Sequence, residues 1–351
     1  MQPTRSLPKL GCRDRAGCRL WIKHTACSVL VCTMAGASIL LPAGIEATAG
    51  DYPARPVTLV VPWPPGTSPD GIARILGPKL ADRLGKPFII ENRLGAGSLL
   101  GAASVAKADP DGHSLLVGTS SSFTTGPILR KNPPYDPARD FVPLAMVGYT
   151  PFVLVVNPAL PVHSVSDLIN LAKQKPGELS YGSGGPGHPA HIYTELLKKM
   201  TGIQMVHVPY KGSTPALTDV VGGHIPLMFA DPLPSLALVA DGKVRALAVS
   251  SSTRLVSAPN IPTMAEAGVP GFDAVGWIML VAPAKTPAQI VNKLRSELVP
   301  FLAAPDVQSW IVKNGIIPAK PQSPEDLQRF IDSDIARWRG VLEEIGIAGS
   351  L

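Results

Sequence analysis

The chain has 351 residues, four cysteines and a formal net charge of +6, with 32 Lys+Arg against 26 Asp+Glu. A hydrophobic content of 45% with only 17% charged residues excludes an intrinsically disordered chain. The length favours two domains, and a chain of this size can bury a sizeable core without disulfide or metal support. A basic balance can indicate nucleic-acid binding, but that interpretation depends on where the charges lie.

The first 49 residues have the three parts of a secretory signal peptide. All four cysteines and six basic residues lie before residue 33, an apolar stretch follows at about 26–43, and small residues end it in an A-x-A pattern at 47–49. A permanent membrane anchor is the alternative, but the stretch is interrupted by glycine, serine and proline and is shorter than the ~20 residues that a span needs. We expect cleavage after Ala49, export by the general route because no Arg-Arg pair occurs, and a periplasmic mature protein.

Without the predicted signal peptide, the chain has a lower net charge and no cysteine. The mature chain, residues 50–351, has 26 basic and 24 acidic residues and no cysteine. A net charge of +2 gives no support to nucleic-acid binding. The absence of cysteine suits an oxidising exported compartment. No second long apolar stretch occurs, so we expect a soluble protein and a monomer.

In the mature chain, short β-branched runs alternate with segments whose apolar residues recur at helical spacing. Val57–Pro62 is typical of a strand buried on both faces, and Pro69–Leu84 follows as a helix that Gly85 ends. Further strands are expected at Pro87–Ile90, Ser114–Thr119, Phe152–Val156, Leu179–Gly182, Met205–Val208, Pro226–Phe229, Val244–Val249 and Gly276–Val281. Further helices are expected at Gly101–Lys107, Ser164–Lys175, His188–Met200, Pro215–Val221, Ser235–Asp241, Pro287–Leu302 and Pro324–Ile345. The alternation predicts an α/β fold with right-handed βαβ units and a mostly parallel sheet.

The strands are too many for one compact sheet, so two α/β lobes are expected. The chain would cross between them near Gly148–Phe152 and near Phe272–Gly276. The predicted organisation is therefore a signal peptide at 1–49, a first lobe made of 50–150 plus 274–351, and a second lobe at 151–273.

Ligands of α/β proteins bind at the carboxyl ends of strands, where helix N-termini present amide groups. The first loop at such a position is residues 63–70, in which Ser68 or Asp70 can cap the following helix, or the free amides can hold an anion. The second loop, residues 119–122, carries four hydroxyl groups that either bond a ligand or cap the next helix.

The third loop, Gly182–His188, matches the dinucleotide pattern G-x-G-x-x-G. The strand that follows it has no acidic residue to bind a ribose, so we reject a dinucleotide and expect an amide-rich anion cradle. Asp231 follows another strand, where it either caps a helix, contacts a ligand or closes the lobes. Lys211 is either a surface residue or a charge at the rim that attracts an anion.

Enzyme and metal sites are weakly supported. His188, His191 and Glu195 have a loose metal-ligand spacing on one helical face, but no zinc motif surrounds them and contacts with solvent or loops are the alternative. Neither G-x-S-x-G nor a committed Ser-His-Asp set occurs. We expect no catalytic residue, no metal and no cofactor, and an exported metal-assisted or hydrolytic enzyme remains the competing hypothesis.

A series of motifs then runs through the mature chain in order. They are Tyr52-Pro-x-Arg-Pro56, Glu91-Asn-Arg-x-Gly-Ala-Gly97, Ala106-Lys-Ala-x-Pro-Asp-Gly112, Pro134-Tyr-Asp-Pro-x-x-Asp-Phe141, Val155-Val-Asn-Pro158, Val206-His-Val-Pro-Tyr-Lys-Gly-Ser213, Gly242-Lys-x-Arg-Ala-Leu-Ala-Val249 and Pro262-Thr-x-x-Glu-Ala-Gly268. Together they resemble the Bug-type receptors, the solute-binding proteins of tripartite tricarboxylate transport systems, from about residue 52 to 347.

The resemblance implies a two-lobed, periplasmic-binding-protein-like (type II) architecture with a ligand cleft between the lobes. It implies a non-enzymatic receptor that holds a small carboxylate through loop amides, hydroxyls and bridging waters, and whose closed form is read by the permease subunits of such a transporter or by a sensor. The residues carried over as ligand-binding are Pro65, Gly66, Ser68, Asp70, Thr119, Ser120, Ser183, Gly184, Gly187 and Asp231, to which Thr67 and His188 of the same loops are added.

Three positions depart from the family pattern, and one of them, Lys285 in place of a frequent glycine, alters only a surface turn. Thr67 stands where the family often has the second glycine of Pro-Gly-Gly, which adds a hydroxyl group and removes backbone freedom. Ala230 separates Asp231 from the preceding Met-Phe pair, which shifts the register of that carboxylate. Because Thr67 lies in a predicted ligand loop, a ligand preference different from that of other members is expected.

Overall fold

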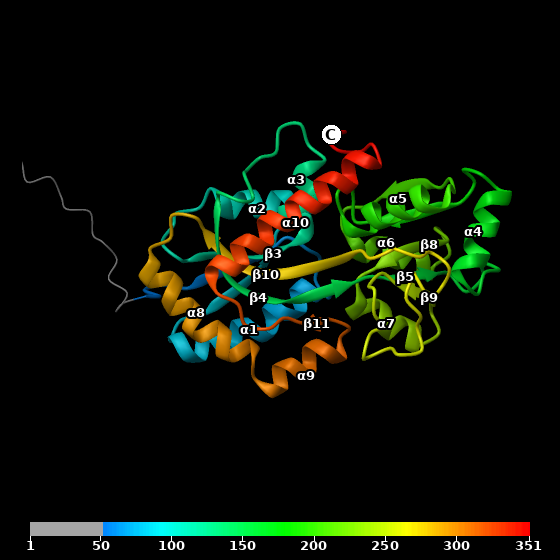
Figure 1. The fold of residues 1–351 in the computed structure, drawn as a ribbon. Helices are drawn as coiled ribbons and strands as arrows, with labels where there is room; N and C mark the ends of the chain where they lie inside the picture. The colour runs from blue at the N-terminus through cyan, green and yellow to red at the C-terminus, as the bar shows by residue number, and fades with distance from the viewer. Residues whose placement is uncertain (1–51) are drawn as a thin grey trace, which may run out of the picture. The chain divides into compact units, whose positions relative to one another are not determined.

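The computed structural model describes residues 52–351 (Figure 1), so the predicted signal peptide and its cleavage site lie outside the described residues. Sheet A has the strand order β11-β4-β10-β3-β1-β2, and sheet B has the order β7-β6-β8-β5-β9. Sheet A consists of β1 (Val57–Val61), β2 (Phe88–Asn92), β3 (Ser114–Thr119), β4 (Phe141–Pro151), β10 (Val275–Pro283) and β11 (Ile317–Pro318). Sheet B consists of β5 (Val153–Val156), β6 (Ser180–Ser183), β7 (Val206–Pro209), β8 (Leu227–Ala230) and β9 (Arg245–Val249).

Helices separate most of these strands, which confirms the predicted α/β class. They are α1 (Ser68–Leu84), η1 (Ala96–Ser98), α2 (Leu99–Ala106), the π-helical turn η2 (Ser121–Thr125), α3 (Gly126–Ile128), α4 (Val165–Gln174), α5 (Pro189–Thr201), α6 (Ser213–Val221), α7 (Pro232–Ala240), α8 (Ala288–Leu302), α9 (Pro305–Lys313) and α10 (Pro324–Glu344). β4, whose run contains two prolines and a glycine, is not predicted from the sequence, and neither are α9, β11 and the short elements η1, η2 and α3.

The expectation of a mostly parallel sheet is wrong. In sheet A, β1 pairs in parallel with β2 and β3, but β10 is antiparallel to both β3 and β4. In sheet B, β6 is parallel to β7 and β8, whereas β5 is antiparallel to β8 and β9. A strand covered by helices on both faces has the same apolar run in either direction, so its residues carry no sign of the orientation.

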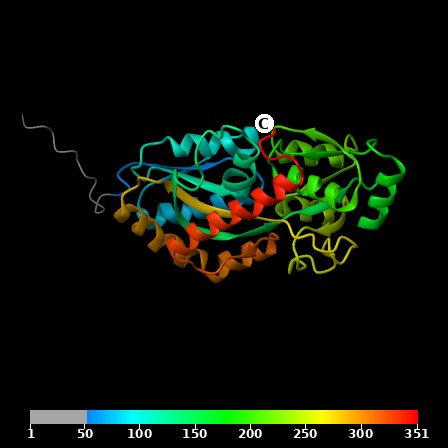
Figure 2. The ribbon, with the colours of Figure 1, turned by 45° about the horizontal axis from the view of Figure 1, so that its top comes forward.

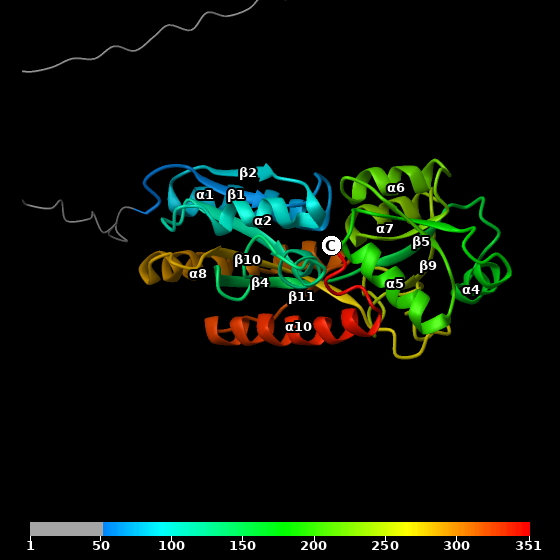
Figure 3. The ribbon, with the colours of Figure 1, turned by 90° about the horizontal axis from the view of Figure 1, so that it is seen from above.

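The central strands of sheet A are buried on both faces, as their continuous apolar runs predict. Alternate residues of one strand enter different cores: Leu59 and Val61 pack with α1 residues, whereas Val60 packs with α2 residues. Figure 1 shows α1, α8 and α9 on one side of this sheet and α2 and α10 on the other. In sheet B, α6 and α7 cover one face and α5 covers the other (Figure 3).

The chain passes from sheet A to sheet B between β4 and β5, and it returns between β9 and β10. α10 then connects the two parts once more. Its Trp338 stacks on Tyr193 of α5 with ring centroids 5.9 Å apart, and Figure 2 shows the red α10 reaching the green helices beside sheet B. Among the described residues, no helix combines the length and apolar character that a membrane crossing requires.

Candidate functional site

A cavity of about 260 Å³ lies where loops from both sheets meet. Its wall is formed by the loops that follow β1, β2, β6 and β7, and these strands lie in parallel pairs within their sheets. The lining residues are Pro62, Trp63, Pro64, Leu94, Gly95, Ala96, Gly97, Ser98, Gly184, Gly185, Pro186, His188, Pro209, Tyr210, Lys211, Gly212 and Ser213. This is the position at the carboxyl ends of strands that the sequence indicated for a ligand.

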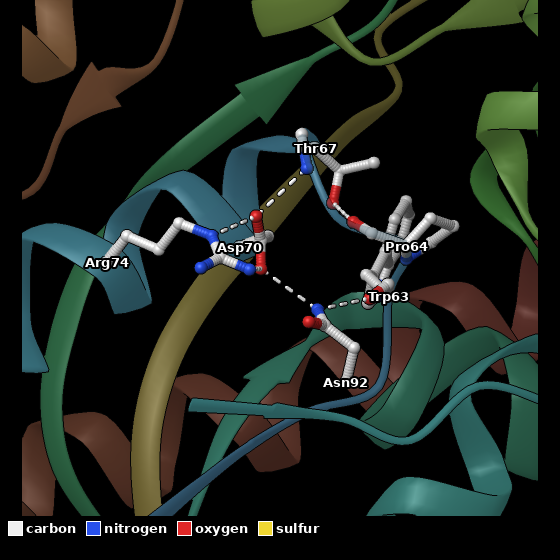
Figure 4. Close-up of polar contacts among 7 residues, drawn as sticks. Trp63, Pro64, Thr67, Asp70, Arg74 and Asn92 are labelled. Atoms are coloured by element: carbon white, nitrogen blue, oxygen red, sulfur yellow. Dashed lines mark hydrogen bonds and ion pairs between the residues drawn. The ribbon is translucent and has the colours of Figure 1, made fainter. Parts of the chain in front are cut away.

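The loop after β1 is organised by Asp70 (Figure 4). Its carboxylate accepts hydrogen bonds from the Gly66 amide (2.9 Å), from Asn92 Nδ2 (2.9 Å) and from Arg74 through Nε (2.8 Å) and Nη2 (3.0 Å). Burial raises the pKa of Asp70, but these donors and the Arg74 charge outweigh it, and the pKa lies below its usual value. Asp70 therefore shapes the loop instead of facing the cavity.

We expect Asp70→Asn to lower the free energy of unfolding by about 2–3 kcal/mol at pH 7, because charge-assisted bonds to a buried acceptor are lost. Since the pKa is lowered in the folded state, the stabilisation is present above the unfolded value of 3.8 and is lost as the pH falls through the folded value. Urea unfolding at pH 7 and pH 3 measures this, with exposed Asp82→Asn on the same helix as control. An equal deficit at both pH values would contradict the assignment.

Ser68 and Asp231 join the two sheets. Asp231 Oδ1 accepts from the Ser68 amide (3.1 Å), from Ser68 Oγ (2.7 Å) and from the Leu233 amide (3.1 Å), so one carboxylate caps α7 and meets the N-terminus of α1. Burial raises the pKa of Asp231 to about 6, although these three donors act in the opposite direction. The amide at the start of α1 therefore binds a carboxylate of the protein, that of Asp231.

The hydroxyl groups after β3 support the cavity wall from behind. Thr119 Oγ1 accepts from the Trp63 indole (3.1 Å) and lies 3.0 Å from Ser121 Oγ, which in turn lies 2.9 Å from Ser98 Oγ. Ser120 is buried but does not line the cavity. The cluster thus fixes the orientation of Trp63, whose ring forms part of the lining.

η2 contacts elements on two sides. Thr124 Oγ1 donates to Asp334 of α10 (2.7 Å), and Thr125 Oγ1 donates across to the Gly187 carbonyl in the loop before α5 (2.7 Å). The second of these bonds, like that between Ser68 and Asp231, joins elements that pack on different sheets.

The glycine-rich loop after β6 is held by Ser183. Its Oγ lies 2.6 Å from His207 Nε2 and accepts from the Gly185 amide (3.0 Å). Gly184 and Gly185 line the cavity, while Ser183 is fully buried behind them. Ser183 consequently positions the loop.

His188 presents a buried donor at the cavity. Its ring lies 4.7 Å from the Trp63 ring, and its Nδ1 accepts from the Ala190 amide (3.1 Å) as the cap of α5. Burial first, and then the neighbouring histidines, lower the pKa of His188 to about 3, so the ring is neutral at pH 7. Because Nδ1 accepts, the proton is on Nε2, and this buried atom has no hydrogen-bond partner.

The spacing of His188, His191 and Glu195 does not produce a metal site. His191 stacks on His207 with centroids 4.3 Å apart, and Glu195 accepts from Lys198 (2.8 Å) and from Tyr181. Within residues 52–351, no group of three or more His, Cys, Asp or Glu side chains is arranged to hold a metal ion.

The loop before α6 lies outside the predicted set of site residues. Its cap, Gly212, has φ +111° and offers no side-chain acceptor, so the first amides of α6 lack a capping partner. The next residue, Ser213, is 4% exposed, lines the cavity, and has no partner for Oγ. At α1, α2, α5 and α7, which also begin near the cavity, the protein provides acceptors: Asp231 at α1 and α7, Gly95 O at α2 and His188 at α5.

The comparison with known proteins agrees with this arrangement. Residues 72–347 match the family described as the tripartite tricarboxylate transporter family receptor. The chain belongs to this family. Protein BugT of Bordetella pertussis is 39% identical over 307 residues, which cover 87% of this chain and 94% of BugT.

Solved structures of similar proteins include two with bound ligands. Rpa4515 of R. palustris with adipate has a TM-score of 0.82 and 39% identity, covering 85% of this chain and 99% of that one. MatC (Rpa3494) from Rhodopseudomonas palustris with bound malate has a TM-score of 0.79 and 32% identity, covering 83% of this chain and 100% of that one. The periplasmic binding protein BugD has a TM-score of 0.81 and 32% identity, covering 85% of this chain and 99% of that one. The Bug-type resemblance, the fold and the function as a periplasmic solute-binding receptor are thereby confirmed.

Within this receptor, the predicted site residues have different positions. Gly184 and His188 line the cavity. Thr67, Ser68, Asp70, Thr119, Ser120, Ser183, Gly187 and Asp231 lie in the loops behind or beside it, and Pro65 and Gly66 form an exposed turn. Their part in binding stays a prediction. Most of the missed lining residues belong to the loops after β2 and β7, and the others, Pro62, Trp63, Pro64, Gly185 and Pro186, lie in the predicted loops after β1 and β6 or next to them. The glycines of Gly95-Ala96-Gly97 and Gly212-Ser213 at strand ends are the signal that could have identified the loops after β2 and β7.

Proposed function

We propose that this receptor captures a small carboxylate in the cavity and delivers it, without catalysis, to the permease subunits of a tripartite tricarboxylate-type transporter. The observation that carries the proposal is the uncapped N-terminus of α6, where Ser213 Oγ is buried and unpaired at the cavity wall. A helix N-terminus with a free hydroxyl donor suits an anion of carboxylate size. Adipate in Rpa4515 and malate in MatC, both carboxylates, support this.

Binding would couple to closure of two lobes, at 50–150 plus 274–351 and at 151–273, after export and removal of residues 1–49. The bonds from Ser68 to Asp231 and from Thr125 to Gly187 support this, since each joins elements of the two proposed lobes. A ligand that bonds groups on both sides favours the closed state by its extra contacts there. A sensor protein in place of the permease would use the same closed state.

A thermal-shift screen of the purified protein tests the function. Small carboxylates are expected to raise the melting temperature in a concentration-dependent way, whereas glucose, sucrose and neutral amino acids leave it unchanged. Isothermal titration of the positive compounds confirms a single site. A selective response to sugars or neutral amino acids, with no carboxylate active, would reject the proposal.

A further inference from the structure

We propose that the ligand is a monocarboxylate with an apolar body, and not a di- or tricarboxylate. The inference rests on the proposed carboxylate function and specifies its ligand class. It follows from two features of the cavity: carboxylates of the protein already occupy amides at the start of α1, and the facing wall is largely apolar.

The first feature is the occupation of the amides in the loop after β1, which lies opposite α6. The Gly66 amide donates to Asp70, the Ser68 amide donates to Asp231, and the Thr67 amide donates to the Pro64 carbonyl (3.4 Å). Two carboxylates of the protein thus stand at the start of α1. A second ligand carboxylate at this end would find the amides taken and would be repelled by like charge.

The second feature is the chemistry of the lining. Seven of its twelve non-glycine residues are apolar: Pro62, Trp63, Pro64, Leu94, Ala96, Pro186 and Pro209. Lys211 is the one cation among the lining residues in the described chain, and its side chain is exposed at the rim. A carboxylate placed against this wall would lose its hydration and gain at best the neutral Nε2–H of His188, while an alkyl or phenyl group would gain by burial. The rings of Trp63 and His188, inclined at 45° to each other, add aromatic surface against which such a group can pack.

Hexanoate and adipate form the decisive pair of probes, because they have the same carbon chain and differ in one carboxylate. We expect isothermal titration at pH 7 to give at least tenfold tighter binding of hexanoate, with benzoate also bound and malate and citrate weaker than hexanoate. Tighter binding of adipate, malate or citrate than of hexanoate would overturn the ligand class and leave the carboxylate function intact. Absence of binding by every carboxylate would overturn the function itself.

Two pairs of variants locate the ends of the ligand. Ser213→Ala is expected to weaken hexanoate binding roughly tenfold, because a hydrogen bond to a charged group is lost. The control is Thr214→Ala at the next residue, whose side chain is exposed, and this change should leave the affinity unchanged. Leu94→Lys places a cation on the apolar wall and is expected to shift the ratio of affinities at least tenfold toward adipate. Leu100→Lys, exposed outside the cavity, keeps the wild-type ratio. An unchanged ratio in Leu94→Lys, with the protein folded by circular dichroism, would overturn the assignment of that wall.

Discussion

As the pH rises from 4 to 7, the wild type is expected to lose about 2–3 kcal/mol of unfolding free energy that the Asp231→Asn variant does not lose. The carboxylate is fully buried, and its pKa rises from 3.8 in the unfolded chain to about 6 in the folded protein. Its contribution to stability is therefore fully present below pH 3.8 and is lost as the pH rises through about 6. Asparagine keeps an oxygen for the Ser68 and Leu233 donors but does not ionise.

Urea unfolding at pH 4, 5.5 and 7 measures this difference. Asp241→Asn at the exposed end of the same helix is the control, and its unfolding free energy should change by less than about 0.5 kcal/mol at each pH. Asp231→Ala removes the acceptor altogether and should be less stable than the asparagine variant at every pH, because Ser68 and the α7 cap lose their partner. A wild-type pH profile unaltered by Asp231→Asn would show that this carboxylate is not the buried titrating group.

Gly97→Ala is expected to weaken hexanoate binding by at least 100-fold. Gly97 has φ +65°, and a Cβ there would lie 2.4 Å from the Pro186 carbonyl oxygen in the opposite loop. The position of the Cβ is fixed by its own backbone, and the oxygen is a backbone atom, so no rotation of a side chain relieves the overlap. The loops must separate, and since both line the cavity, the ligand loses contact with one of them.

A matched control separates this effect from the cost of the backbone conformation. Gly85 has φ +74°, and a Cβ added there would have no atom within 4 Å, so Gly85→Ala carries the conformational cost, about 1–2 kcal/mol, without the contact. Titration and thermal unfolding of both variants are compared. Gly97→Ala is expected to lose at least as much stability as Gly85→Ala, and hexanoate binding is expected to be lost only in Gly97→Ala. Normal binding of hexanoate by Gly97→Ala would contradict closure of these loops on the ligand.

Much of the fold could be predicted because the local signals are strong. The predicted strand at Ser114–Thr119 has the observed limits, and the helix after β1 ends at Gly85, which takes the left-handed conformation of a cap. β4 escapes prediction because Pro143 and Pro151 are typical of loops, although its long pairing with β10 accommodates them. The direction of β10 and β5 depends on pairing between distant segments, which no local pattern reports.

The site is predictable in position and less so in detail. The ends of the strands indicate correctly which loops form the site. However, an acidic residue at a helix N-terminus can either cap the helix within the protein or lie near a ligand, and the sequence does not distinguish the two. Ser68 illustrates this, because its partner Asp231 is 163 residues away and no spacing connects them. Ser213 escapes prediction because a serine after Lys-Gly looks like an ordinary helix start, and only the lack of any acceptor in three dimensions distinguishes it.

The π-helical turn η2 also makes this segment intolerant of insertions and deletions. Thr124 and Thr125 are adjacent, yet they donate to α10 and to the loop before α5 in different directions. Deleting or inserting one residue ahead of them would rotate both by roughly 80–100° and break both bonds. Insertions and deletions should therefore be excluded from 121–125 during divergence of these receptors, while the exposed turn at 132–134 is free to vary in length.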